Sequence, residues 1–536
     1  MSMLEPALIQ PVLVDGQWRA AQAPQGSFRA EDPALGEKIG PTFPISSVAD
    51  IETALAAGAA VAAELAAAPP ARIADFLEAY AEGIDTDADA LVALAAAETA
   101  LAAETRLRKV ELPRTSGQLR QAARAVLSYS WTQPVIDTGA GLRAHRSPLG
   151  KPVFVFGPNN FPYAFNAISG SDFASAIAAR NPVIAKAHPL HPATSQRLAE
   201  LAHNALKASG LPAAAVQMLY HFDNLLGVQL AGDSRLGAIG FTGSRAGGLA
   251  LKAAADKAGV PIYVELSSIN PVFLLPGALA ERGTALAQEF FASCTMGSGQ
   301  FCTNPGLVVV PQGAAGDAFA AEAQAHFAGD APRILFSRSG QENALRAIAA
   351  LQRAGAQVLS GGSSGEGAGY RVESTLLATD AACFLADPLA LQAEAFGPVS
   401  LIVRTRDASA MVEIAVALEG NLTGTIYRAA DGSDDAAWSA IAAELRYKVG
   451  RLIANKMPTG VAISGAMNHG GPYPSTGHPG FTSVGMPAAI HRFSALHSYD
   501  GVPQGLLPVE LRNRNPGGVQ RLIDGRWSDA DVAGDK

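Results

Sequence analysis

Short, mostly apolar runs recur along the chain, separated by more polar segments. Within each run the apolar residues follow one another instead of alternating with polar ones, which is typical of strands in a parallel sheet covered on both faces. The first group of predicted strands comprises 152–156, 182–186, 216–219, 236–241 and 260–266. These runs therefore predict one buried, parallel sheet.

Helical patterns separate several of these runs. One places Leu198, Leu201 and Ala205 on one face and ends at Gly210, a residue type that often follows the last helical turn. Another helix is predicted at 246–258. Strands that alternate with helices in this way indicate βαβ units, so this part of the chain is expected to be α/β.

A second series of strands and helices follows. Helices are predicted at 279–296, 316–328, 341–354 and about 408–418, and strands at 306–311 and 401–403. The two α/β halves are expected to join near 270–280 without a flexible linker. The glycine-rich stretch at 361–370 lacks the GKS or GKT of a phosphate-binding loop, so we interpret it as a surface turn.

The remaining segments flank these two series. Residues 11–45 predict short strands with a hairpin turn at Asp15-Gly16, and residues 47–130 predict helices. Residues 131–150 mix turn residues with short alternating runs, which indicates an extended excursion from the core. The last 30 or so residues are more polar and are expected at the surface.

The composition narrows the class of protein. The chain has 536 residues, of which 49% are hydrophobic and 16% charged, and this excludes general disorder. A net charge of −8 gives no basic surface for nucleic acid. No run approaches the ~18 apolar residues of a membrane-spanning helix, and the amino terminus shows no export signal. Neither nucleic acid nor a membrane is therefore an expected partner.

Three cysteines, Cys294, Cys302 and Cys383, are too few for a disulfide framework, and no CxxC pair indicates zinc. We therefore expect a reducing compartment, the cytoplasm. Cys302 lies in GQFCTNPG, where small neighbours let a substrate approach and backbone N–H groups can stabilise an anion. An inert packing role is the alternative for Cys302 and the main interpretation for the other two.

Two polar residues near strand ends are further candidates. Glu265 ends an apolar strand, where a carboxylate has to be paired, protonated or functional, unless it simply lies at the surface. Ligands of α/β sheets bind beyond the carboxyl ends of the strands, so Glu265 could act there as a general base. Asn160, in GPNNFP, could donate to an oxyanion or simply form a turn.

Other polar residues at strand ends could contact a cofactor. Lys186 ends a predicted strand and could reach a ribose or a phosphate. His188 and His191 could pair on a metal, but no third ligand is evident, so loop packing or phosphate contact is the main interpretation and no metal is expected. Phe241-Thr-Gly-Ser244 begins a helix whose N–H groups could face a pyrophosphate.

Taken together, these segments resemble the aldehyde dehydrogenase superfamily over nearly the whole chain. The resemblance is specific because the motifs occur in the order of the family. They are DPALGE (32–37), GPNNFP (157–162), PVIAKAHP (182–189), GFTGS (240–244), VEL (264–266), GQFCTNPG (299–306) and EAFGPV (394–399).

The resemblance implies a catalytic nucleophile, Cys302, a general base, Glu265, and a side-chain oxyanion donor, Asn160. In the implied reaction Cys302 attacks an aldehyde, a nicotinamide cofactor accepts hydride, and Glu265 activates water to release the acid. The implied cofactor-binding residues are Phe156, Pro158, Lys186, His188, Gly243, Ser244, Glu394 and Phe396.

The chain departs from the common family pattern in two places. Pro189 replaces a glutamate that normally pairs with the ribose 2′-hydroxyl, which favours NADP and leaves NAD open. Ser267-Ser268 replaces the usual glycines after the general base, which implies changed packing there.

Within the family, the bacterial α-ketoglutaric semialdehyde dehydrogenases are the most similar subgroup. The similarity includes KAHPLHPATS, GQFCTNPGLVVV, HGGPYPSTG (469–477), FTSVG (481–485) and the tail at 501–516. Gly480 stands where many relatives have an arginine, so Arg492 or another basic residue would have to bind a substrate carboxylate. A broad specificity for aliphatic or aromatic aldehydes, a CoA-acylating reaction and a non-catalytic binding protein are the alternatives.

The family also implies an architecture: two Rossmann-like α/β domains with parallel sheets and a small β oligomerisation element. Residues 1–130 and 151–277 would form the cofactor-binding domain and 278–490 the catalytic domain. Residues 131–150 and 491–536 would supply oligomerisation strands and the tail. A homodimer or homotetramer is therefore expected.

Overall fold

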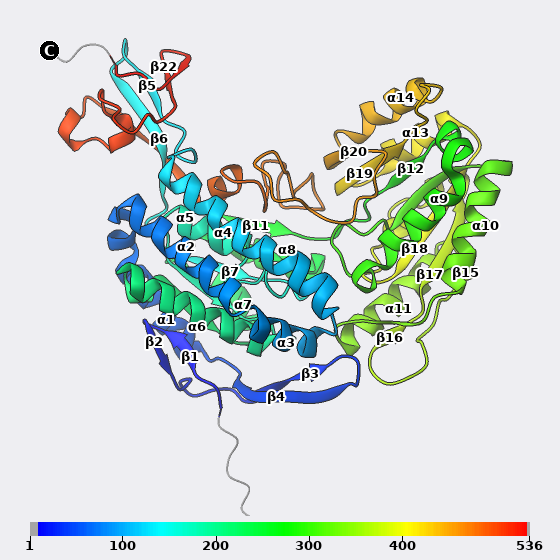
Figure 1. The fold of residues 1–536 in the computed structure, drawn as a ribbon, viewed down its shortest axis with the longest axis horizontal. Coiled ribbons are helices and arrows are strands. Elements are labelled where there is room, and N and C mark those ends of the chain that lie inside the picture. Colours follow the sequence, from blue (N-terminus) through cyan, green and yellow to red (C-terminus); the bar gives the residue numbers. More distant parts are fainter. Residues whose placement is uncertain (1–8, 533–536) are drawn as a thin grey trace, which may run out of the picture.

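The computed structural model describes residues 9–532, so the first eight residues of the amino-terminal segment considered above lie outside it. Two large α/β bodies lie side by side, and a smaller sheet projects from one of them (Figure 1). A long hairpin, β3 (Ser27–Asp32) with β4 (Glu37–Pro44), runs from the first body toward the second. There Tyr370 donates a hydrogen bond to Glu31 at 2.6 Å, which ties the hairpin to the second body.

The first sheet has the order β11-β10-β7-β8-β9-β1-β2. Its parallel strands are β7 (Val153–Phe156), β8 (Val183–Lys186), β9 (Val216–Leu219), β10 (Ala238–Thr242) and β11 (Ile262–Glu265). The antiparallel hairpin of β1 (Val12–Val14) and β2 (Gln17–Arg19) extends one edge. Every strand predicted between 152 and 266 is thus confirmed, as is the turn at Asp15-Gly16.

Helices pack around this sheet and bury its apolar side chains. They are α1 (Val48–Ala67), α2 (Pro70–Thr86), α3 (Ala88–Thr99), α4 (Leu112–Leu127), α5 (Ser171–Ala178), α6 (Pro192–Ser209), α7 (Asn224–Ala231) and α8 (Arg245–Ala258). A π-helical segment, η1 (Ala103–Glu111), precedes α4. The pattern predicted α6, α8 and helices over 47–130, and Gly210 ends α6 in the left-handed conformation.

The second sheet has the order β15-β17-β18-β13-β12-β19-β20 and is parallel except at β15. Its strands are β12 (Val272–Leu274), β13 (Leu307–Pro311), β15 (Gln357–Ser360), β17 (Thr375–Asp380), β18 (Val399–Thr405), β19 (Asn421–Tyr427) and β20 (Val449–Ala454). The sequence predicted only β13 and β18 of these.

Six helices accompany the second sheet. They are α9 (Pro276–Thr295), α10 (Ala314–Ala328), α11 (Arg338–Arg353), α12 (Ala381–Ala386), α13 (Ala408–Ala417) and α14 (Asp435–Leu445). The predicted helices at 279–296, 316–328, 341–354 and 408–418 correspond to α9, α10, α11 and α13. A two-stranded pair, β14 (Arg333–Ile334) with β16 (Arg371–Val372), lies near the hairpin contact.

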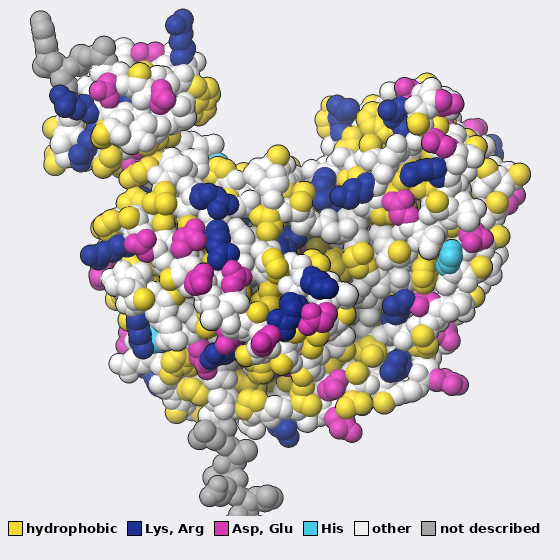
Figure 2. Space-filling view, viewed as in Figure 1, with side chains coloured by type: hydrophobic (Ala, Val, Ile, Leu, Met, Phe, Trp, Pro, Cys, Tyr) yellow, Lys and Arg dark blue, Asp and Glu magenta, His cyan; other side chains and the backbone are white. Residues whose placement is uncertain are grey.

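The projecting sheet joins the two segments that were expected to form oligomerisation strands. Its order is β21-β6-β5-β22-β23, with β5 (Val135–Asp137), β6 (Leu142–Pro148), β21 (Ser494–Asp500), β22 (Arg521–Ile523) and β23 (Arg526–Ser528). Figure 2 shows this lobe standing clear of the rest of the surface. The tail is not purely a surface element, because Leu511 and Arg521 are fully buried.

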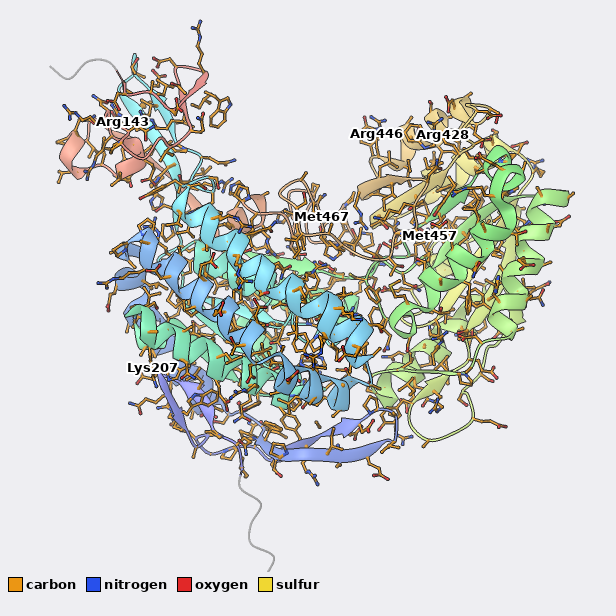
Figure 3. The ribbon with its side chains drawn as sticks, in the orientation of Figure 1. Arg143, Lys207, Arg428, Arg446, Met457 and Met467 are labelled. Atoms are coloured by element: carbon orange, nitrogen blue, oxygen red, sulfur yellow. The ribbon has the colours of Figure 1, made fainter. Side chains whose placement is uncertain are left out.

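A crossing segment, residues 455–493, returns from β20 to the first body. Met467, labelled in Figure 3, lies on this segment between the two bodies, and Met457 lies on the side of the second. Met486, Ile490 and Phe493 pack into the first core. The last strand of the first sheet, β11, ends at Glu265, yet Met486, Ile490 and Phe493 belong to the first core again. The sheets and the core packing therefore give different boundaries, and the domain limits stated in the sequence analysis stay a prediction.

Among residues 9–532, no single helix is long and apolar enough to span a membrane. Helices α1 and α2 pass the length and composition test only as a pair, which is bent by 116°.

Gly299 fixes the backbone just before Cys302. Its φ is +70°, and a Cβ there would lie 2.1 Å from the carbonyl oxygen of Gly397. Only glycine tolerates both the conformation and this close approach. The loop that carries Cys302 is therefore held against the segment that begins β18.

Replacing Gly299 with alanine should lower the thermal unfolding midpoint well below that of a matched control. Gly259→Ala has the same φ of +70° and open space around the new Cβ. The control should cost about 1–2 kcal/mol for the left-handed conformation. Gly299→Ala adds displacement of the Gly397 backbone, about 1–3 kcal/mol more. Equal midpoints in calorimetry would contradict this account of the loop.

Candidate active site

Most of the predicted site residues lie at one edge of the first sheet, beyond the carboxyl ends of its strands. Phe156, Lys186 and Glu265 are the last residues of β7, β8 and β11. The strands are parallel, so their carboxyl ends meet at the same edge, where ligands of such sheets bind. The fold thereby brings together residues that are far apart in the sequence.

Six of the eight predicted cofactor residues line one cavity of about 510 Å³, which we call the β7–β10 cavity. These six are Phe156, Pro158, Lys186, His188, Gly243 and Ser244. Ser244 caps α8 by accepting a hydrogen bond from the Gly247 N–H at 3.3 Å. The amino terminus of α8 therefore opens on the cavity, as a site for a phosphate group requires.

The basic residues of the β7–β10 cavity differ in charge. Burial lowers the pKa of Lys186 to about 8. Burial, and then His191 and Lys186, hold the pKa of His188 well below its usual value, so this ring is neutral at pH 7. His191 faces the Pro158 carbonyl at 3.2 Å and the Ser195 hydroxyl at 3.3 Å, which fits the loop-packing interpretation of this histidine.

Glu394 and Phe396 lie apart from these six residues. Glu394 lines a neighbouring cavity of about 300 Å³ together with Ser267, Ser268 and Arg245. Burial raises the pKa of Glu394 to about 7, against hydrogen bonds from Ser267 and the Ser268 backbone. Phe396 shares a smaller hollow with Glu394, beside Gly299 and Phe301. The two residues thus flank the loop that carries Cys302.

Side-chain amides hold the Cys302 loop in place. Asn270 donates to the carbonyls of Cys302 and Asn304, both at 2.9 Å. The Asn160 amide, from the loop after β7, donates to the Gln300 carbonyl at 2.9 Å. Asn160 is therefore next to the predicted nucleophile, and its amide is oriented by the loop.

A histidine that sequence reasoning passed over lies between two predicted catalytic residues. His469 Nε2 is 2.9 Å from Glu265 Oε1 and 3.3 Å from Cys302 Sγ. Ser483 donates to the other Glu265 oxygen at 3.1 Å. The only sequence signal was a polar residue within the glycine-rich HGGPYPSTG motif, which by itself assigns no role.

The surroundings of Cys302 oppose its ionisation. Burial, followed by the negative charge of Glu265, raises the pKa of the Cys302 thiol well above its usual value. Glu394 acts in the same direction, whereas Arg114 and Arg451 favour the thiolate. Since the thiolate is the nucleophile, this thiol needs a proton acceptor and a nearby positive charge.

The other two cysteines have packing environments, as predicted. Cys294 is fully buried, and burial raises the pKa of its thiol to about 12. The Cys383 thiol donates a hydrogen bond to the Ala354 carbonyl at 3.5 Å.

A second large cavity, of about 640 Å³, lies between η1, α4 and the Cys302 loop, and we call it the η1–α4 cavity. Its wall is largely apolar, with Phe161 and Phe301, but it includes Arg106 and Arg114. Arg114 Nη1 donates to the Val461 carbonyl, while its buried Nε and Nη2 have no hydrogen-bond partner within residues 9–532. Sequence reasoning gave neither arginine a role.

Arg492, the basic residue suggested for a substrate carboxylate, lies elsewhere. It is buried, forms an ion pair with Asp172 at 2.7 Å, and packs between Phe481 and Phe493. This ion pair inside the first body counts against Arg492 in that role, which stays a prediction.

Comparisons with known proteins agree with this arrangement. The model of the aldehyde dehydrogenase family matches residues 18–497. The chain is 40% identical over 516 residues to alpha-ketoglutaric semialdehyde dehydrogenase 2 of Azospirillum brasilense, covering 94% of this chain and 96% of that protein. It is 35% identical over 464 residues to alpha-ketoglutaric semialdehyde dehydrogenase of Acinetobacter baylyi, covering 84% and 86%.

Solved structures share the fold at lower identity. Lactaldehyde dehydrogenase of Escherichia coli superposes with a TM-score of 0.78 at 22% identity, covering 92% of this chain and 99% of that one. PnpE in complex with nicotinamide adenine dinucleotide gives 0.78 at 21% identity, covering 92% and 98%. The predicted α/β fold class is therefore confirmed, and the chain belongs to the aldehyde dehydrogenase family, whose members oxidise aldehydes with NAD(P).

Proposed function

We propose that this enzyme oxidises α-ketoglutaric semialdehyde to α-ketoglutarate through a thioester on Cys302. The observation that carries the proposal is the η1–α4 cavity, where buried N–H groups of Arg114 have no hydrogen-bond partner in the part of the chain that the structure describes and lie next to the Cys302 loop. A buried cation with unused donors suits the carboxylate of a short acidic aldehyde. The two relatives that bear the name of this activity support the same substrate.

In the proposed reaction Cys302, as thiolate, attacks the carbonyl carbon of the aldehyde. An amide group has two N–H donors. One Asn160 N–H is used on the Gln300 carbonyl, which orients the group, and we assign the other to the oxyanion together with the Cys302 backbone N–H. A bound nicotinamide cofactor would supply the hydride acceptor for the substrate carbon. Glu265 then takes a proton from the water that hydrolyses the thioester.

The substrate carboxylate is assigned to Arg114 and not to Arg106. Arg106 is paired with Glu111 at 2.5 Å, so most of its charge is already neutralised. Burial lowers the pKa of Arg114 to about 10, which leaves the group charged at pH 7. The apolar wall around it also favours a second candidate function, a broad specificity for apolar aldehydes.

Residues of the β7–β10 cavity fit a dinucleotide, and we infer a preference for NADP over NAD. No carboxylate stands at position 189, where proline replaces it, and Lys186 and His188 line the cavity. Lys186 would pair with the 2′-phosphate, while Glu394 would bind the nicotinamide ribose beside Phe396.

A homo-oligomer and a cytoplasmic location complete the proposal. Exposed Leu496 and Trp527 on the edge strands β21 and β23 suit a subunit interface.

Substrate specificity can be tested with a panel of aldehydes, each with NAD and NADP. The panel contains α-ketoglutaric semialdehyde, succinic semialdehyde, glutaraldehyde, benzaldehyde and a long aliphatic aldehyde. Arg114→Met should lower kcat/KM for the two acidic aldehydes about 10–100-fold, because a hydrogen bond to a charged group is worth about 1.5–3 kcal/mol. The uncharged aldehydes should be much less affected.

Arg120→Met is the matched control for Arg114→Met. Arg120 lies on the same helix, but its ion pairs with Glu78 and Asp85 are at the surface. Its replacement should leave the panel unchanged. A wild-type preference for apolar aldehydes would favour the second candidate function instead.

Glu265→Gln should stop the enzyme at the thioester. Rapid mixing should then show a burst of one NAD(P)H per active site followed by very slow turnover, whereas Cys302→Ala should show no burst. A normal steady state of Glu265→Gln would remove Glu265 from this role. Faster turnover when CoA is added, with acyl-CoA formed in place of the acid, would favour the CoA-acylating alternative.

The pH dependence of KM tests the cofactor assignment. Lys186 is charged below its pKa of about 8 and loses its charge as the pH rises through that value. The KM for NADP should therefore rise between pH 7 and pH 9, while the KM for NAD stays nearly flat. Lys186→Met should lose the preference for NADP, whereas Lys207→Met should keep it, because Lys207 lies on the exposed part of α6 (Figure 3). A flat profile for NADP would exclude Lys186 as its partner.

A further inference from the structure

His469 is placed against the reacting sulfur by the crossing segment. Its backbone N–H donates to the Thr482 hydroxyl at 3.0 Å, and its carbonyl accepts from the Ser483 N–H at 2.8 Å. These two bonds join residues 469 and 482–483 into a narrow loop that aims the imidazole into the site. The ring lies 5.6 Å from that of Phe165, and the residue is 2% exposed. Its position is therefore set by the fold.

The imidazole contacts both protein groups that gain or lose a proton in the proposed reaction, Cys302 and Glu265. Nε2 lies 3.3 Å from Cys302 Sγ and 2.9 Å from Glu265 Oε1. Within residues 9–532 no hydrogen bond joins Cys302 directly to Glu265, although the thiol and a carboxylate oxygen lie within 4.8 Å. His469 is thus the group in contact with both.

We propose that His469 is a catalytic residue that accepts the proton of the Cys302 thiol and, as imidazolium, stabilises the thiolate. In the imidazolium the single Nε2–H lies between the thiolate sulfur and Glu265 Oε1, so the carboxylate shares this hydrogen bond and holds the ring in place. This inference deepens the proposed function, on which it rests, by naming the group that activates the nucleophile.

The proton balance is simple. The S–H bond of Cys302 breaks, its proton forms an N–H bond at His469 Nε2, and the electron pair stays on sulfur. Sulfur then bonds to the aldehyde carbon, whose C=O π pair moves to oxygen. After hydride transfer to NAD(P) leaves the thioester, the imidazolium passes its proton to water. When water hydrolyses the thioester, the C–S bond breaks, sulfur leaves as thiolate, and the proton that Glu265 took from water returns to it. The one proton released through His469 is then the proton that the oxidation of an aldehyde to an acid sets free.

The charges around the thiol explain why such a group is needed. Glu265, from β11, and Glu394, from the loop before β18, both oppose a second negative charge at Cys302. Arg114 of α4 and Arg451 of β20 favour it, but from beyond hydrogen-bond distance within residues 9–532. Among residues 9–532, only His469 offers a donor that touches the sulfur. A protonated imidazole there converts the pair into a thiolate–imidazolium pair.

The two carboxylate oxygens of Glu265 then have separate tasks. Oε1 faces His469, while Oε2 accepts a hydrogen bond from Ser483, a residue of the same crossing segment. This arrangement orients the carboxylate while His469 carries the proton. Glu265 is freed from contact with His469 when the imidazolium has lost its proton, and it can then accept one from water.

The decisive measurement is the pH profile of Cys302 alkylation in the enzyme without substrate. Iodoacetamide modifies the thiolate, and mass spectrometry of the Cys302 peptide separates it from Cys294 and Cys383. Burial and the two carboxylates alone would hold the midpoint above the usual thiol value of about 8.5, and the proposed imidazolium should bring it below that value in the wild type. His469→Gln should raise the midpoint by at least one unit and slow alkylation at pH 7 about tenfold or more. His469→Phe should act in the same direction.

His326→Gln is the matched control, because His326 also lies beside a carboxylate, Glu322 at 3.5 Å, but on α10 and partly exposed. It should leave the profile unchanged. Equal midpoints in the wild type and His469→Gln would overturn the proposal and leave His469 a merely structural support of Glu265. If the His469 variants do not fold, a wild-type midpoint above about 8.5 would overturn it as well.

The two proposals can fail separately. Alkylation measures the state of the thiol whatever reaction the enzyme catalyses, so it tests the role of His469 alone. Retained turnover in Cys302→Ala would remove the thioester mechanism. An unshifted alkylation profile together with an inactive Cys302→Ala would remove only the inference about His469.

Discussion

A thiol that has to ionise where burial favours its neutral form is the constraint on which the rest of the site depends. Burial and two nearby carboxylates, Glu265 and Glu394, oppose a negative charge on Cys302. Bulk water could stabilise the thiolate, but it would also compete for the aldehyde carbonyl and weaken the electrostatic interactions inside the site. The protein therefore has to supply fixed donors and positive charges of its own. His469, Arg114 and Arg451 are the groups placed to do so.

Meeting this constraint requires both α/β bodies at once. Glu265 ends a strand of the first sheet, Cys302 precedes a strand of the second, and the crossing segment from β20 brings His469 between them. Further polar contacts hold the same region: Asn160 reaches Gln300 from the first body, and Asn270 fixes the carbonyls beside Cys302. The site thus lies where the two bodies meet. Hydrogen bonds to backbone carbonyls, from Asn160 and Asn270, fix the position of the loop that carries Cys302.

The sequence predicts an element of this arrangement only where neighbouring residues form a recognisable pattern. Strands β7 to β11 were predictable because their buried residues are apolar and consecutive. Strand β19 was missed because it carries polar residues that are nevertheless buried. Its Asn421 accepts hydrogen bonds from the N–H groups of Ile269 and Asn270, and so organises the loop that holds Cys302. Helix α5 was missed because it is buried nearly all round and has no polar face to reveal a period.

The residues of the candidate site, too, were predictable only where a sequence motif contains them. Cys302, Glu265 and Asn160 lie within ordered motifs, so a resemblance could assign them roles that the geometry supports. His469 is 167 residues from Cys302, and no local pattern connects the two. Arg114 was hidden in an ordinary helix, since only the folded chain shows that its N–H groups lack partners. Arg492 illustrates the opposite case, because a suitable residue type is already paired with Asp172 in the folded chain.

The path of the crossing segment has a consequence for the newly made chain. Cys302 leaves the ribosome well before His469, since 167 residues separate them in the sequence. Domains generally fold as units during synthesis. Until the crossing segment docks, the Cys302 thiol lacks the proton acceptor that we assign to it, His469. On that assignment, the oxidation-sensitive thiolate–imidazolium pair forms only after residues 455–493 have packed into place.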